Sequence, residues 1–183
     1  RNPEPLDDRP WRSQVEVIAT DLLDREQVRT ALAEATRAFY LVHSMSASSD
    51  FEGLEAEMAE TFAWAAATAN LKQVVYLGGL GAESQTHSRH LTSRHRVGTI
   101  LASGKTPVTE LRAAVIIGSG SASFEMLRSL VEVLPFMVVP RWVTQTRCQP
   151  VAIGDILQLL VAVLNRDSVL GQVFDVGGPD IVT

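Results

Sequence analysis

The chain has a single cysteine in 183 residues, so it has no internal disulfide. Cys148 is predicted to be a packing residue rather than a nucleophile. No apolar run is close in length to a membrane-spanning helix, which needs about 18 residues. No segment of the chain is rich in basic residues. The net charge of −5 leaves no basic surface for nucleic acids or anionic membranes. These absences predict a soluble, cytoplasmic protein that binds a small-molecule substrate or a regulatory protein partner, with no nucleic acid and no membrane involved.

Tyrosine and lysine are also scarce. The two tyrosines, Tyr40 and Tyr76, lie in apolar segments, and neither is followed by a lysine four positions later. Tyrosine–lysine reductases need that spacing because an ammonium one helical turn away lowers the pKa of the phenol. The two lysines, Lys72 and Lys105, are both misplaced for this role. The chain therefore cannot assemble that general acid.

What the sequence does contain is an alternation of strand-like and helix-like patterns. Strands are predicted at 15–20, 38–42, 74–81, 111–117, 137–139 and 173–176. Helices are predicted at 24–34, 50–69, 121–134 and 153–164, with a further amphipathic segment from Leu91 to Gly104. This alternation favours an α/β fold with a doubly wound parallel sheet of the Rossmann type. The run 74–81 ends in glycines, which is typical of a central strand that opens onto a ligand crevice.

Two local patterns support the helix assignments. Asp24 is followed by Gln27 three residues later, which predicts an N-cap, and Asp50 can cap the helix after it. Apolar residues at helical spacing in that second helix predict a stripe that covers one face of the sheet. The stripe consists of Leu54, Met58, Phe62, Ala65, Ala66 and Ala69.

A glycine-containing turn at 118–120 has two interpretations. It follows a predicted strand and opens a helix, which is where a phosphate-binding turn lies, but it has only two of the three glycines of that motif. Glycine is also the ordinary residue of any tight strand-to-helix turn. A loop on the substrate side of the crevice is therefore the favoured interpretation.

Three histidines, His87, His90 and His95, form the second candidate group. Zinc would need carboxylate or thiolate partners at ligand spacing, and only Glu83 lies nearby, so no metal site is predicted. Solvated residues at the start of a helix are the simplest interpretation. If Arg94 and His95 face the crevice instead, they can hold an anionic ligand.

Two charged residues stand out beside predicted strands. Asp21 follows the first strand, where it can cap a turn or accept a hydrogen bond from an adenine amino group. Arg112 lies within an otherwise apolar strand and needs a partner or a ligand if its guanidinium is buried.

Taken together, several segments resemble a divergent member of the short-chain dehydrogenase/reductase superfamily. The nearest group is the atypical, NmrA-like NAD(P)-binding proteins, often labelled nucleoside-diphosphate-sugar epimerases. The segments that match correspond to strands of the family fold, to the residues just after them, or to the entry of a late helix. They are 1–3, 21–22, 40–44, 76–81, 111–118 and 149–155.

The resemblance implies NADP, or else NAD, as the cofactor. It places Arg1 beside the adenosine 2′-phosphate, which favours NADP, and it places 21–22 at the adenine and 42–44 beside the pyrophosphate and the ribose. The implied cofactor-binding residues are Arg1, Asp21, Leu22, Val42, His43, Ser44 and His95. The implied substrate-side residues are Gly78, Gly79, Arg94, Arg112 and Gly118.

The chain departs from the family at the residues that carry its chemistry. Gly78 or Gly79 stands where the family has its catalytic serine, and Leu91 and His95 stand where it has Tyr-x-x-x-Lys. The family's glycine-rich phosphate turn lies on its first strand, and the chain begins after it. The resemblance therefore implies one domain, 1–183, incomplete at its N-terminus, with a gap two strands wide between 15–20 and 38–42.

Two functions remain open. The first is an oxidoreductase or epimerase-like enzyme that acts on a small substrate, favoured by the polar residues His43, Ser44, Arg94, His95 and Arg112. The second is a non-catalytic dinucleotide sensor of NmrA type, favoured by the lost serine, tyrosine and lysine. The sequence assigns no catalytic residue in either case.

Overall fold

A four-stranded parallel sheet forms the centre of the computed structural model, which describes residues 6–42, 51–81, 89–118, 122–134, 141 and 146–182. In spatial order, its strands are β1 (Arg37–Tyr40), β2 (Gln73–Gly79), β3 (Val108–Ala113) and β6 (Val173–Val176). All three neighbouring pairs run parallel. The parallel α/β sheet predicted from the alternating pattern is confirmed.

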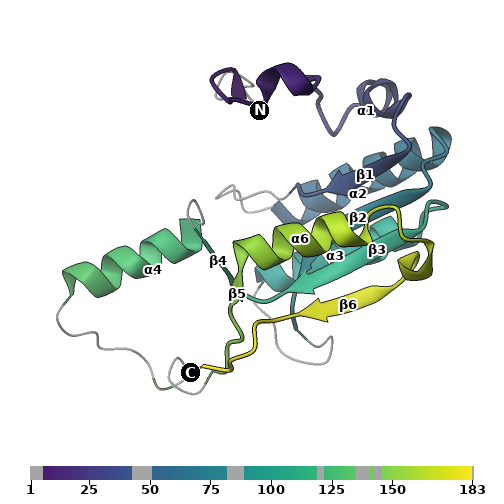
Figure 1. Ribbon diagram of the computed structural model, residues 1–183. Helices are drawn as coiled ribbons and strands as arrows, with labels where there is room; N and C mark the ends of the chain where they lie inside the picture. Colours follow the sequence, from purple (N-terminus) through teal and green to yellow (C-terminus); the bar gives the residue numbers. More distant parts are fainter. Residues whose placement is uncertain are drawn as a thin grey trace.

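Helices cover both faces of this sheet (Figure 1). The helices α2 (Phe51–Thr68) and α3 (Arg89–Ala102) lie on one face, and α1 (Arg25–Leu32) packs against α2. The helix α6 (Ile153–Val163) lies on the opposite face. The helix α4 (Ala122–Val133) projects away from the sheet. The doubly wound arrangement is therefore also confirmed.

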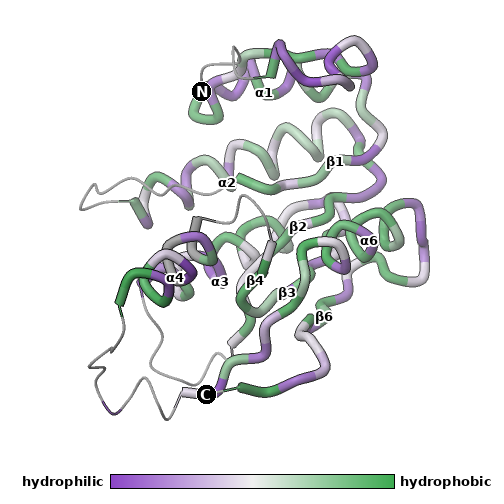
Figure 2. Tube along the Cα trace, turned by 60° about the vertical axis from the view of Figure 1, so that its left-hand side comes forward, coloured by the Kyte–Doolittle hydropathy of each residue, from purple (hydrophilic) through white to green (hydrophobic). Residues whose placement is uncertain are grey.

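The central strand β2 contributes to two hydrophobic cores because its side chains alternate between the faces of the sheet. Val74 and Tyr76 pack in the core under α2 and α3, whereas Val75 packs in the core under α6. All three are at most 2% exposed. Figure 2 shows green, hydrophobic stretches in the strands of the sheet where they lie between the helices.

The predicted strand at 111–117 is wrong in one respect, because the structure divides it between two sheets. The strand β3 ends at Ala113, and β4 (Ile116–Ile117) then pairs with β5 (Val151–Ala152) in a separate two-stranded parallel sheet. The amide of Ala114 still donates to Val176, but the carbonyl of Val115 already accepts from Val151. The backbone thus changes its hydrogen-bonding partner from β6 to β5 between these two residues. The unbroken apolar run gave no sign of this change.

The predicted strand at 15–20 is also wrong. The segment has no strand partner within the described residues, and the short 3-10 helix η2 (Arg12–Gln14) precedes it. Val15 is 45% exposed and Ile18 is 51% exposed. A β-branched sequence forms a strand only where a neighbouring strand pairs with its backbone and covers its side chains. The strand predicted at 137–139 lies outside the described residues.

The other elements differ from the predictions only at their ends. The strand predicted at 38–42 already ends at Tyr40, and Leu41 and Val42 are 50% and 40% exposed. The strand β6 and the helices α4 and α6 begin and end within one residue of their predicted bounds. A short 3-10 helix, η3 (Asp167–Val169), follows α6. None of the described helices combines the length and hydrophobicity needed to cross a bilayer.

The buried face of α2 is wider than the predicted stripe. Phe62, Ala65 and Ala66 are buried as predicted, whereas Leu54 and Met58 are only half-buried. The helix packs between α1 and α3 as well as on the sheet, so residues beside the stripe are buried too. One of them is a carboxylate, Glu55.

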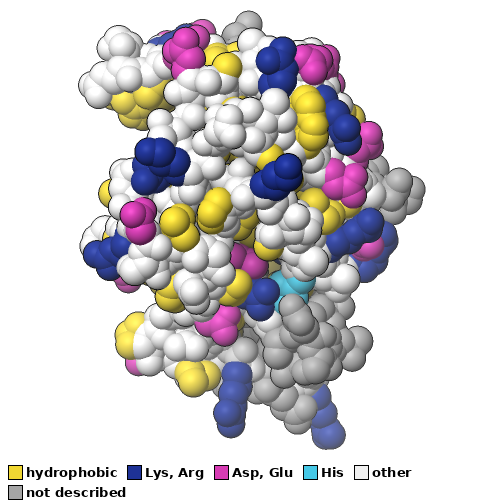
Figure 3. All heavy atoms as spheres, turned by 90° about the vertical axis from the view of Figure 1, so that its right-hand side faces the viewer, with side chains coloured by type: hydrophobic (Ala, Val, Ile, Leu, Met, Phe, Trp, Pro, Cys, Tyr) yellow, Lys and Arg dark blue, Asp and Glu magenta, His cyan; other side chains and the backbone are white. Residues whose placement is uncertain are grey.

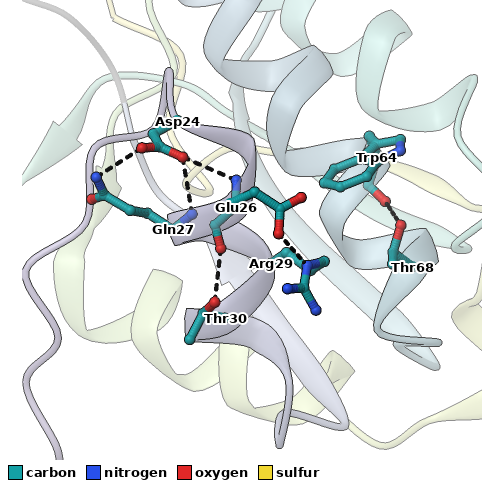
Figure 4. A network of polar contacts seen from close by, with 7 residues as sticks. All are labelled: Asp24, Glu26, Gln27, Arg29, Thr30, Trp64 and Thr68. Atoms are coloured by element: carbon teal, nitrogen blue, oxygen red, sulfur yellow. Dashed lines mark hydrogen bonds and ion pairs between the residues drawn. The ribbon is translucent and has the colours of Figure 1, made fainter.

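The predicted N-cap of α1 is confirmed (Figure 4). The Oδ1 atom of Asp24 accepts hydrogen bonds from the backbone amides of Glu26 and Gln27, at 3.0 and 3.1 Å. The side-chain amide of Gln27 donates to Oδ2 of Asp24 at 2.9 Å. The backbone amide of Gln27 is the main cause of a lowered pKa for the Asp24 carboxyl.

We expect Asp24→Ala to destabilise α1, because two amides at the helix start lose their acceptor. Since the folded-state pKa is lowered, the stabilisation by the carboxylate is present above the ordinary pKa of 3.8 and is lost as the pH falls through the folded value. Urea unfolding at pH 7 and at pH 3 measures this, with Asp24→Asn as the control that keeps an acceptor. A destabilisation of equal size at both pH values would contradict the assigned charge effect.

Candidate functional site

The carboxyl ends of the strands meet at one edge of the sheet. In the register of β2 and β3, Gly78 is paired with Arg112 and Gly79 with Ala113. Val42 follows the end of β1 at the same edge. Because ligands of open parallel α/β sheets bind outside the carboxyl ends of the strands, this edge is the candidate site.

The helix α3 brings three further side chains to the end of β2. The guanidinium of Arg94 donates to the carbonyl of Leu77 at 3.2 Å, and Nε2 of His95 lies 3.1 Å from the carbonyl oxygen of Gly79. A Cβ atom placed on Gly79 would lie 2.7 Å from Cδ1 of Leu91. The site therefore brings together residues that the sequence separates by more than ten positions.

These contacts position α3 on the sheet. The hydroxyl of Tyr76 donates to the backbone carbonyl of Arg94 at 2.9 Å, which joins the middle of β2 to α3. Leu91 and His95 are four residues apart and so share one face of the helix. That face points to the carboxyl end of β2.

A buried ion pair lies behind the site. Oε1 of Glu110 accepts from Nε of Arg112 at 3.1 Å, and the two side chains are 6% and 21% exposed. Two glycines make room for the carboxylate: a Cβ atom at Gly78 would lie 2.7 Å from Oε1 of Glu110, and one at Gly98 would lie 2.9 Å from its Oε2. The partner that the sequence required for Arg112 is therefore Glu110.

A second buried carboxylate was not predicted from the sequence. Glu55 is 6% exposed and accepts a hydrogen bond from the hydroxyl of Ser93, which is itself 2% exposed. Glu55 lies one helical turn from both Phe51 and Ala59, which are buried. The sequence signal that could have predicted this burial is a charged residue at helical spacing from apolar residues.

Burial is the main cause of raised pKa values for the phenols of both Tyr40 and Tyr76. We expect that neither tyrosine ionises while the protein is folded, so the absorbance of tyrosinate should not rise at pH 10 to 11 and should appear only on alkaline unfolding. The two groups favour folding below the ordinary value of 10.0, and this contribution is lost as the pH rises above it. A titration at 295 nm checks this, with the denatured protein as the control. A transition near pH 10 in folded protein would contradict it.

The structure places the other predicted residues as follows. Asp21 accepts a hydrogen bond from the amide of Leu23, and Leu22 packs against the core under α2. Asp21 therefore supports the turn before α1, which was one of its two predicted roles. Gly118 lies against Ile153, since a Cβ atom at Gly118 would overlap the side chain of Ile153.

Some predicted residues lie outside the described residues, namely Arg1, His43, Ser44, His87 and the rest of the turn after Gly118. His90 is separate from His95, because its ring stacks on Phe51 with the centroids 4.7 Å apart. Cys148 is half-buried, and its backbone pairs with Val182. Within the described ranges, no three histidine, cysteine, aspartate or glutamate side chains form a group that could hold a metal ion.

Two cavities lie at the opposite, amino-terminal edge of the sheet. One has a volume of about 400 Å³ and lies between the end of α2 and the turn after α3, beside Trp64 and Lys105. The other has a volume of about 190 Å³ and lies beside Pro107 and Val173. Neither is lined by Gly79, Arg94 or His95, so the candidate site rests on the strand ends and not on cavity size.

Among the residues that it colours, Figure 3 shows basic, acidic and hydrophobic side chains interspersed on this face.

The chain matches no family model. A curated relative from Arabidopsis thaliana, NADH dehydrogenase [ubiquinone] 1 alpha subcomplex subunit 9, mitochondrial, is 25% identical over 174 residues. The match covers 93% of this chain but only 43% of the relative. The chain thus spans less than half of that protein.

Solved structures match the fold over most of the chain. A nucleoside-diphosphate-sugar epimerase from Staphylococcus aureus has a TM-score of 0.77 at 16% identity, covering 97% of this chain and 60% of its own. The enzyme WbmG from Bordetella bronchiseptica, crystallised with NAD and UDP, has a TM-score of 0.74 at 16% identity, covering 92% and 59%. A short-chain dehydrogenase/reductase superfamily protein from Agrobacterium tumefaciens, with bound NAD, has a TM-score of 0.72 at 13% identity, covering 95% and 69%. The chain therefore has the fold shared by short-chain dehydrogenases/reductases and nucleotide-sugar epimerases.

Proposed function

We propose that this chain is the NAD(P)(H)-binding part of an atypical reductase-like protein that binds the dinucleotide without reducing a substrate. The observation that carries the proposal is the contact between Leu91 and Gly79 at the carboxyl end of β2. By the resemblance, Leu91 stands where the family has its catalytic tyrosine, and Gly78 or Gly79 stands where it has its serine. Here one is an aliphatic side chain and the other has no side chain, so neither can donate a proton.

The residues at this edge fit a dinucleotide. Leu41 and Val42 are half-exposed just after the end of the neighbouring strand β1. The partly buried Arg94 supplies a positive charge and N–H donors beside the end of β2. When bound, the nicotinamide ring supplies hydride-transfer chemistry. Structures with the same fold were crystallised with NAD, which supports this assignment.

A role as a subunit rather than an enzyme has separate support. The plant relative is named as a subunit of an NADH dehydrogenase, and its match covers nearly all of this chain. In such a role, the bound dinucleotide would stabilise a surface that a regulatory protein partner recognises. The relative is named mitochondrial, whereas the cytoplasm remains our proposal for this protein.

An oxidoreductase or epimerase-like activity on a small substrate is the second candidate. Arg94, His95 and Arg112 favour it, because polar side chains at the crevice can orient a substrate. The chemistry would then need a proton donor other than the family's tyrosine.

Binding and turnover of NADPH by the full-length protein separate the two candidates. We expect NADPH to bind in a fluorescence titration and not to be oxidised with quinones, carbonyl compounds or nucleotide sugars. The triple variant Gly79→Ser, Leu91→Tyr, His95→Lys restores the family residues and serves as the matched control. Leu91 is replaced together with Gly79 because a Cβ atom at position 79 would lie too close to the Leu91 side chain. Oxidation of NADPH by the unaltered protein with any of these substrates would overturn the non-catalytic assignment.

The preference for NADP over NAD rests on Arg1, which lies outside the described residues. A guanidinium that binds the 2′-phosphate makes a charge-assisted contact that NAD cannot offer. We therefore expect Arg1→Ala in the full-length protein to weaken NADP binding about tenfold or more and to leave NAD binding nearly unchanged. Calorimetric titration with both dinucleotides tests this, and equal losses for the two would remove Arg1 from the phosphate.

A further inference from the structure

Among the described residues, the partly buried guanidinium of Arg94 makes its polar contacts with neutral groups. It donates to the main-chain carbonyl of Leu77, which does not neutralise a charge, and it lies beside the phenol of Tyr76, which stays neutral. Within the described residues, Arg94 has no carboxylate oxygen within 4.0 Å. A partly buried cation without a counter-ion is costly, so a protein that keeps one generally uses it.

The nearby acids are engaged elsewhere. Glu110 pairs with Arg112, and Glu55 accepts from Ser93. Asp175 on β6 is exposed and lies in register with Arg112. Within the described part of the chain, neither Glu110 nor Glu55 forms an ion pair with Arg94, although both carboxylates and Arg94 lie near enough to act on the phenol of Tyr76.

The position of Arg94 indicates which kind of ligand its guanidinium can bind. Its side chain runs beside Gly79, because a Cβ atom there would lie 3.4 Å from Cδ of Arg94. The guanidinium therefore lies at the carboxyl end of the central strand, at the edge where ligands of this fold class bind. A guanidinium carries five N–H donors in a fork that matches carboxylate and phosphate oxygens.

We propose that Arg94 binds an oxyanion, the carboxylate or phosphate group of a small-molecule ligand, at the carboxyl end of β2. This deepens the proposed function, on which it rests, by naming the chemistry of a ligand in the crevice. The oxyanion belongs either to the dinucleotide itself or to a second, acidic molecule that binds beside it. His95 follows Arg94 on α3 and anchors the helix at the carbonyl of Gly79, which fixes the direction of the guanidinium.

The test compares the full-length protein with Arg94→Gln, using Arg96→Gln as the matched control. Arg96 lies on the same helix, is exposed, and loses the same charge. The probes are inorganic pyrophosphate, malonate and NADPH, each followed by binding affinity and by the shift of the thermal unfolding midpoint. Arg94→Gln is expected to weaken the response to at least one oxyanion about tenfold, while Arg96→Gln leaves it unchanged.

The pattern of losses distinguishes the sources. Weaker binding of pyrophosphate and NADPH assigns the oxyanion to the dinucleotide, whereas weaker binding of malonate alone assigns it to a second acidic ligand. Without ligand, Arg94→Gln should change the unfolding temperature little, because the removal of a partly buried charge offsets the loss of the hydrogen bond to Leu77. Unchanged responses to all three probes, or a lowered midpoint with unchanged binding, would overturn the proposal. Failure of the unaltered protein to bind NADPH would refute the proposed function instead, and the malonate arm would still test Arg94.

Discussion

Tyr76→Ala should be among the most destabilising single substitutions in this chain, with an expected loss of about 4 kcal/mol of unfolding free energy. The side chain is 1% exposed and lies between the sheet and α3, with its ring centroid 6.0 Å from that of Tyr40. Truncation leaves a cavity and also removes the donor to the carbonyl of Arg94. Urea unfolding measures the loss.

Tyr76→Phe is the matched control, because it keeps the ring and removes only the hydroxyl. We expect it to cost about 1 kcal/mol, the usual net contribution of one hydrogen bond. If Tyr76→Phe proved as destabilising as Tyr76→Ala, the hydrogen bond to α3 and not the packing of the ring would dominate, contrary to this account.

The second large effect is expected at the buried ion pair. Arg112→Met should cost about 3 kcal/mol, because it leaves the carboxylate of Glu110, whose side chain is 6% exposed, without its cation. The double variant Glu110→Gln, Arg112→Met should recover much of this loss, since no charge remains uncompensated. Chemical unfolding of the two single variants and the double variant gives the coupling energy directly.

Additive effects in that cycle would show that Glu110 and Arg112 do not interact in solution. Arg112→Lys is the conservative control, because it keeps a cation on β3 but loses the planar guanidinium. We expect it to lie between the unaltered protein and Arg112→Met in stability.

The architecture could be predicted from the sequence because it depends on local periodicity. The run from Val74 to Gly79 is apolar on both faces, which is the pattern of a strand buried between two layers of helices. Asp24 and Gln27 likewise marked the start of α1 through a purely local hydrogen-bond pattern. Such signals need no knowledge of distant residues.

The segment 15–20 shows where this reasoning stops. Its β-branched residues favour an extended backbone, but a strand also requires a neighbour, and the described residues provide none. The break after Ala113 has the same origin. Residues 111–117 look like one strand, yet the chain exchanges β6 for β5 as its neighbour midway.

The candidate site was only partly predictable. The resemblance pointed to Leu91, His95 and either Gly78 or Gly79, and in the structure Leu91 and His95 both lie beside Gly79. The pairing of Arg112 with Glu110 was missed, although residues two apart on a strand point to the same face. The sequence did not show that α3 covers this face and buries the carboxylate against Gly78 and Gly98.

Hydrogen–deuterium exchange of the full-length protein with and without NADPH tests the central claim most directly, because it locates the dinucleotide on the fold. The account predicts slower amide exchange at 40–42 and 77–81, the carboxyl ends of β1 and β2, and at 91–95 of α3. Unchanged exchange in these segments, or protection confined to the cavity beside Trp64 and Lys105, would contradict it.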